Sequence, residues 1–155
     1  AAMLGLPFAF ASHFAPDHMA QAISLYRERF TPSKQLAEPY AMLTVNVFAA
    51  ETEAEAKRLF TSMQVQFINL IRGVPGRVQP PLDDIETYWR PEEKAMIQRS
   101  LARSFVGTAT AIEQGLREFI STYTPDELMV SGHFFEPEAR LNSLRITAEV
   151  RDLLA

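Results

Sequence analysis

The amino-acid sequence predicts an α/β fold with a parallel sheet. Strand-like apolar runs alternate along the chain with longer segments in which apolar residues recur at helical spacing. Strands that are separated by helices pair in parallel through right-handed crossovers. The chain has 155 residues, 47% of them hydrophobic, and is long enough for one domain with a substantial core.

The first elements follow from local signals. The chain is predicted to open in the last turn of a helix, because the apolar residues 1–4 precede Gly5 and Pro7, which are typical of a helix end. The first strand is predicted over 7–12. Pro16 suits the first position of a helix, and apolar residues recur behind it at helical spacing.

A second strand and a capped helix are predicted next. Residues 41–49 form this strand, which contains the β-branched Val45 and Val47. Thr52 and Glu55 fit a capping box, which satisfies backbone N–H groups at a helix start. Behind the box, apolar residues keep the i, i+3, i+4, i+7 spacing of a helix. They are Ala56, Leu59, Phe60, Met63, Phe67, Leu70 and Ile71.

Residues 72–91 interrupt the alternation. They are rich in glycine and proline and contain Trp89, the one tryptophan of the chain. An irregular segment of this length inside a compact domain is usually functional or disordered. We interpret 72–91 as a lid-like excursion.

The last part of the chain returns to the α/β pattern. Helix is predicted over 91–103, a hinge at 105–107, and a further helix capped by Thr108. The third strand is predicted over 127–131, which is a short and mostly apolar run. Pro137 is expected to open the final helix.

Three parallel strands cannot close a barrel, and a parallel sheet normally needs both faces covered. The most economical architecture is a partial (β/α)8 TIM barrel, made of three parallel strands with outer helices. The other units are then absent or supplied by another chain. Open strand edges and an uncovered inner face predict association with the missing half or with a second copy of this chain.

Composition excludes several functions. The chain has no cysteine, which rules out disulfides, thiolate catalysis, iron–sulfur clusters and thiolate zinc sites. Its net charge is −4 and its basic residues are scattered, so no nucleic-acid partner is expected. The apolar start is far shorter than the ~20 residues that span a bilayer, and it lacks the basic region of a signal peptide. We therefore expect a cytoplasmic protein with no membrane partner.

Polar residues lie at the predicted strands, whose carboxyl ends collect ligands in a βα barrel. Ser12 and His13 end the first strand, Asn46 lies in the second, and His133 follows the third. The histidines are candidates for proton transfer or for hydrogen bonding to a ligand. The alternative is that backbone carbonyls satisfy them. Asn46 is either a pocket residue or a partner of the neighbouring backbone.

Other candidates are weaker. Trp89 is either a buried anchor or a lid residue, and the surrounding prolines favour the lid. Ser12, His13 and Asp17 contain the ingredients of a hydrolytic triad, but residues so close in sequence do not adopt its geometry. His13 and His18 lack the i, i+4 spacing of a helical zinc pair, so no metal site is expected. The residues alone leave the catalytic groups undetermined.

Several stretches, taken in order, resemble one known family. They are 4–16, 46–50 with Thr52, 59–64, and 106–108 followed by 126–130. On these stretches the chain resembles the luciferase-like flavin-dependent monooxygenases, in the branch of bacterial luciferase-like oxidoreductases. Members of that family are about twice as long and fold as a (β/α)8 barrel. The resemblance implies that residues 1–155 are its C-terminal half, with barrel strands 6, 7 and 8.

The resemblance also implies a function. Family members bind reduced flavin mononucleotide (FMN), or in some branches a deazaflavin, and use dioxygen to oxygenate a small organic substrate. The phosphate-binding segment of the family would precede Ala1. The resemblance implies that this half contains only part of the family's site. That part consists of Ser12 and His13, the loop around Trp89 as a mobile lid, and the end of the last strand. This half alone is expected to be inactive. The alternative is a non-catalytic remnant or binding module that keeps the scaffold without a complete flavin pocket.

Overall fold

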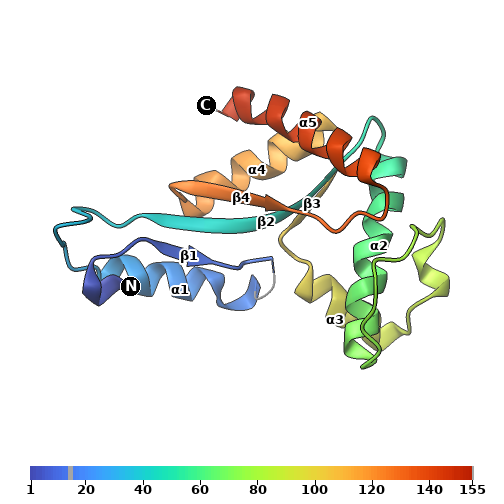
Figure 1. Cartoon of the computed structure of the whole chain (residues 1–155), viewed down its shortest axis with the longest axis horizontal. Coiled ribbons are helices and arrows are strands. Elements are labelled where there is room, and N and C mark those ends of the chain that lie inside the picture. The colour runs from blue at the N-terminus through green and yellow to red at the C-terminus, as the bar shows by residue number, and fades with distance from the viewer. Residues whose placement is uncertain (14–15, 155) are drawn as a thin grey trace.

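The computed structural model of the chain describes residues 1–13 and 16–154. In it, four strands form one parallel sheet (Figure 1). The strands are β1 (Phe8–Phe10), β2 (Ala41–Ala49), β3 (Ser104–Gly107) and β4 (Glu127–Ser131). The α-helices are α1 (Pro16–Glu28), α2 (Glu53–Ile71), α3 (Pro91–Ser100), α4 (Ala109–Tyr123) and α5 (Pro137–Leu154). Two short 3-10 helices, η1 (Ala2–Leu4) and η2 (Ile85–Thr87), complete the elements.

β2 is the central strand of the sheet. β1 pairs with it over Ala41 to Leu43, and β3 pairs with it over Asn46 to Ala49. β4 pairs with β2 from Met42 to Asn46, a stretch that overlaps both of the others. Because a strand has two edges, β1 and β3 must share one edge of β2 end to end, and β4 takes the other. All three pairings are parallel, as the sequence predicted.

The two faces of β2 have different cover. Leu43, Val45 and Val47 alternate toward α1, α4 and α5, and together they form the main core. The helical members of that core are Met19, Ile23, Ile112, Leu116, Phe119, Ile146 and Val150. On the opposite face Phe48 packs against α2 and α3 in a second cluster. Figure 1 shows α2 running across the end of the sheet toward which β2 and β4 point. At the other end of that face Met129 remains 49% exposed.

The start of the chain agrees with its sequence signals. Gly5 ends η1 with φ 60° and ψ 44°, the left-handed conformation that favours glycine. A Cβ atom at Gly5 would also lie 2.5 Å from the Cβ atom of Ser33, so any side chain there would clash. The predicted cap at Thr52 is confirmed in part: its hydroxyl accepts a hydrogen bond from the N–H of Glu55 at 3.2 Å, whereas the Glu55 carboxylate bonds to Arg58 instead of closing the capping box. Among the described residues, no helix is long and apolar enough to cross a membrane.

Two predicted boundaries and the predicted number of strands are wrong, because the sheet has four strands and not three. The first strand is shorter than 7–12, because the chain leaves the sheet after Phe10. The hinge predicted at 105–107 is part of β3, which fills the edge of β2 that β1 leaves unpaired. The helix predicted over 91–103 ends at Ser100, so that the following residues can reach this edge. The strands predicted over 41–49 and 127–131 have their predicted bounds and are β2 and β4.

Candidate functional site at the carboxyl end of the sheet

The structure brings four of the five predicted site residues to one end of the sheet. Asn46 on β2 lies in register with Ser131, the last residue of β4, and His133 follows two residues later. Ser12 and His13 follow β1 and reach β2 at Thr44, two residues before Asn46. Carboxyl ends of parallel strands are where α/β proteins bind ligands. This end is therefore the candidate site.

Ser12 joins the end of β1 to β2. Its side chain is fully buried, and its hydroxyl donates to the carbonyl oxygen of Thr44 at 2.5 Å and accepts from the N–H of Thr44 at 3.1 Å. The hydroxyl thus acts as one more rung of the β1–β2 ladder, at the point where the backbone of β1 has turned away. It supports the position of His13, the next residue.

Replacing Ser12 with alanine should lower the free energy of unfolding by about 1–3 kcal/mol, because both backbone groups of Thr44 would lose their partner in a buried place. Chemical denaturation measures this change. Ser24→Ala is the matched control, since that exposed hydroxyl bonds only to Glu28 on its own helix. If Ser12→Ala lost no more unfolding free energy than Ser24→Ala, the Ser12 hydroxyl would not stabilise the join between β1 and β2.

The two histidines interact electrostatically. Burial lowers the pKa of His13 below its ordinary value of 6.5, and the nearby charge of His133 lowers it further. His13 is therefore predominantly neutral near pH 7 and available to accept a proton. The ring of His133 is half-buried, and its Nδ1 atom lies 2.6 Å from the Oε1 atom of Gln66 on α2. The predicted alternative, satisfaction by backbone carbonyls, does not describe this contact of His133.

Asn46 is fully buried between β3 and β4. Its Nδ2 atom donates to the hydroxyl of Ser104 at 3.1 Å, which is a side-chain contact across the strand pair. Its Oδ1 atom has no hydrogen-bond partner among the described residues. A buried acceptor without a donor costs about 1–3 kcal/mol, so such atoms usually mark a place for water or a ligand.

Trp89 does not join this group. Its indole N–H donates to Glu86 at 3.0 Å, and the ammonium group of Lys94 lies 5.4 Å from the ring centre. The ring also packs, partly buried, against the second core cluster that contains Phe48. Trp89 thus anchors its own loop to the core in this structure, and its role as a lid residue stays a prediction.

The excursion 72–91 is fastened at both ends. The guanidinium of Arg72 makes two bonds to the Glu93 carboxylate, at 2.7 and 2.8 Å, and a third to the carbonyl of Tyr88 at 2.9 Å. The hydroxyl of Tyr88 donates to Asn69 on α2 at 2.9 Å. Sequence spacing does not predict this latch, which joins the two ends of the excursion, although the opposite charges of Arg72 at its start and Glu93 just beyond its end were a signal for it.

The latch should weaken in acid. Hydrogen bonds from Arg72, and next from the backbone N–H of Arg90, lower the pKa of Glu93 from 4.5 to about 2. The folded state thus holds the charged form, so this stabilisation is complete above about pH 4.5 and is lost as the pH falls toward 2. Urea midpoints measured against pH, with Trp89 fluorescence as the signal, should show this step in the wild type. Glu93→Gln should lack it, whereas Glu92→Gln, at an exposed neighbour, should keep it.

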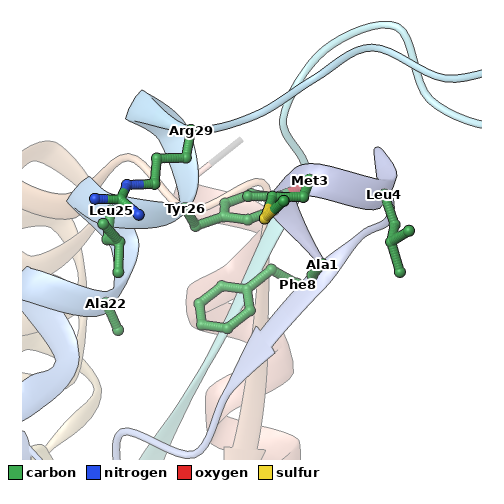
Figure 2. Close-up of a pocket in the computed structure, with 9 residues that line it drawn as sticks. Ala1, Met3, Leu4, Phe8, Ala22, Leu25, Tyr26 and Arg29 are labelled. Atoms are coloured by element: carbon green, nitrogen blue, oxygen red, sulfur yellow. The ribbon is translucent and has the colours of Figure 1, made fainter.

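Apolar grooves lie elsewhere. One has a volume of about 630 Å³ and is lined by the stacked rings of Phe8 and Tyr26. Figure 2 shows side chains of α1 on one side of it and those of η1 and β1 on the other. It lies at the amino end of β1, away from the polar groups. A second, of about 550 Å³, runs between α4, α5 and the edge strand β4. A small polar hollow of about 250 Å³ borders His133, Ser131 and Arg140. No described group of three or more His, Asp or Glu side chains is placed to hold a metal ion.

The fold defines the class as a parallel α/β protein, and two solved structures share this fold. The crystal structure of apo-MsnO8 matches 99% of this chain and 47% of its own, with a TM-score of 0.79 and 26% identity. The oxygenating constituent of 3,6-diketocamphane monooxygenase from Pseudomonas putida, a type II Baeyer-Villiger monooxygenase solved with FMN, matches 92% of this chain and 40% of its own. Its TM-score is 0.56 at 17% identity, which supports the fold alone.

Curated bacterial proteins are similar to this chain in sequence. A protein of Escherichia coli K12 named luciferase-like monooxygenase is 44% identical over 99% of this chain. The uncharacterised protein YvbT of Bacillus subtilis is 44% identical over 95% of it. No protein-family model matches the chain. The chain is homologous to a protein named luciferase-like monooxygenase, in agreement with the resemblance of its motifs, and it spans about half the length of the relatives it matches.

Proposed function

We propose that this chain is part of a flavin-dependent monooxygenase that uses reduced flavin and dioxygen to oxygenate a small organic substrate. The observation that carries the proposal is the 44% identity to a luciferase-like monooxygenase across 99% of the chain. The position of His13, Asn46 and His133 at one carboxyl end of the sheet agrees with it. In this proposal the strands β1, β2 and β4 correspond to barrel strands 6, 7 and 8.

The residues at this end fit one side of a flavin site. A flavin ring needs an apolar contact face and a few fixed polar partners. Met129 supplies exposed apolar surface on the open face of the sheet, and Asn46 supplies a buried acceptor that lacks a donor. His13 and His133 border the same end. When bound, reduced FMN supplies the electrons that activate dioxygen, and a deazaflavin is the alternative cofactor.

The chain's own residues then orient the ligand, exchange protons with it and exclude water. His13, kept neutral by burial, accepts a proton or a hydrogen bond at the ligand. Asn46, which is fully buried, contributes through its bond to Ser104, which holds β3 beside β2 at this end of the sheet. Stacked Phe48 and Phe134, with ring centres 4.3 Å apart, exclude water from the adjoining core. The loop that carries Trp89 covers the second cluster and shields it from solvent.

We also propose that the partner of this chain is the N-terminal half of the same barrel. The relatives are about twice as long as the matched region, and both edges of the sheet, at β1 and at β4, are unpaired among the described residues. Apolar grooves lie beside each of these edges. Coexpression with the preceding half should give one complex with one copy of each. A stable complex of two copies of this chain instead would show self-association and contradict the proposal.

The activity test needs the full-length protein. Purified protein should bind FMN, seen as quenching of flavin fluorescence, and should convert an oxidisable substrate such as an aldehyde to its oxygenated product only when reduced flavin and dioxygen are both present. Product formation is the readout, because reduced flavin also consumes dioxygen by itself. A panel of reduced FMN and reduced deazaflavin separates the two cofactors. A folded full-length protein that binds neither flavin would contradict the monooxygenase and favour the non-catalytic binding module.

A further inference from the structure

His133 is held by a side chain from another element. Its Nδ1 atom lies 2.6 Å from the Oε1 atom of Gln66, which comes from α2, 67 residues earlier in the chain. Both side chains are half-buried. In the part of the chain that the structure describes, no other hydrogen bond involves either side chain. The contact therefore fixes one edge of the imidazole ring to the helix that crosses the end of the sheet.

Gln66 belongs to a polar stripe on α2. Ser62, Gln66 and Asn69 follow one another at i, i+4 and i+7, so they share one face of the helix. Asn69 accepts the hydroxyl of Tyr88 at 2.9 Å, and Ser62 is buried. Through Gln66 and Asn69, this stripe links α2 to His133 after β4 and to Tyr88 in the excursion 72–91.

The contact selects one tautomer of the ring. An amide oxygen only accepts hydrogen bonds, so Nδ1 must carry the hydrogen, and in a neutral ring Nε2 then holds a lone pair. The two nitrogens lie on different edges of the imidazole. Gln66 occupies the first edge and leaves the second for a ligand. His133 also borders the small polar hollow at the end of β4, beside Ser131 and Arg140.

We propose that Gln66 is a positioning residue for His133, holding the Nδ1–H tautomer so that Nε2 accepts a hydrogen bond or proton from the bound substrate. The inference rests on the proposed monooxygenase function and deepens it, because it assigns the role of one ring atom in the same site. It also implies that the substrate presents a hydrogen-bond donor, such as a hydroxyl or a hydrated carbonyl, at this point.

The test reads the tautomer directly. Full-length protein labelled with 15N-histidine is studied by NMR without flavin, and the signals of His133 are assigned from their loss in His133→Asn. We expect Nδ1–H in the wild type and a shift to mainly Nε2–H in Gln66→Leu. Gln66→Glu should retain Nδ1–H, because a carboxylate also accepts. Gln64→Leu, at a half-buried glutamine of the same helix with no hydrogen bond among the described residues, should leave the signals unchanged.

Turnover gives the second readout. At metal sites, losing the hydrogen-bond partner that orients a histidine ligand costs about 10–100-fold. By the same orienting argument we expect a loss of about this size in the kcat of Gln66→Leu with FMN affinity unchanged, and recovery in Gln66→Glu. An Nε2–H ring in the wild type, or an unchanged tautomer in folded Gln66→Leu, would overturn the inference. If Gln66→Leu does not fold, the wild type and Gln66→Glu still decide it. A tautomer shift in a protein without flavin-dependent turnover would support the role of Gln66 and overturn the proposed function instead.

Discussion

Replacing Phe48 with alanine should lower the free energy of unfolding by about 3–5 kcal/mol, the largest loss of stability expected from any variant considered for this chain. Phe48 is fully buried, its ring stacks on Phe134 at 4.3 Å between centres, and Phe60 meets it edge-on at 5.1 Å. The substitution removes both ring contacts and leaves a cavity between β2 and α2. Urea denaturation measures the loss.

A second effect of Phe48→Ala should appear at the candidate site. Phe134 follows His133 directly, so loss of the stack should also loosen the hydrogen bond from His133 to Gln66, and the NMR signals of His133 should broaden or shift. Leu70→Ala is a suitable control on α2, because that side chain is 55% exposed and should cost under about 1 kcal/mol. A folded Phe48→Ala protein with unchanged stability would show that the second cluster does not support the end of the sheet.

The sequence predicted those parts of the fold that depend on local patterns. The bounds of β2 and β4 follow from apolar, β-branched runs, and the cap at Thr52 follows from one residue pair. β3 was missed because Phe105 and Val106 are a short run beside a glycine, which locally resembles a hinge. Only the vacant edge of β2 beyond Leu43, a tertiary feature, makes this run a strand.

The placement of the candidate site residues was predictable for a related reason. His13 and His133 were expected at one end of the sheet because strand ends of a parallel sheet converge, and this argument needs the order of elements alone. Gln66 was missed because it lies on a helix whose apolar spacing dominates its sequence. Its partner is 67 residues away, so no spacing rule connects them. Trp89 was grouped with the site on composition, whereas its contacts with Glu86 and Lys94 are set by how the loop folds.

His13→Ala is expected to give the largest loss of activity in the full-length protein. A side chain that transfers a proton in the rate-limiting step contributes about 10²–10⁴-fold, so kcat should fall by that factor while FMN affinity changes little. His18→Ala is the matched control, since His18 is an exposed histidine on α1 and lies outside the candidate site. If folded His13→Ala turned over as fast as the wild type, His13 would not transfer a proton and its role would be structural.

The pH dependence of the wild type distinguishes proton transfer by His13 from simple packing. Burial and the charge of His133 hold the pKa of His13 below 6.5, so its neutral form persists to lower pH than in a free histidine. Activity that needs neutral His13 should therefore stay constant from neutral pH to below 6.5 and then fall as the pH drops through the lowered pKa. His133→Asn removes the second cause of the lowering, and the acid limb of its residual activity should move to higher pH. A purely structural role of His13 would not shift the acid limb of the pH profile. A shift to higher pH in His133→Asn would therefore show that His13 is the group whose protonation stops the reaction.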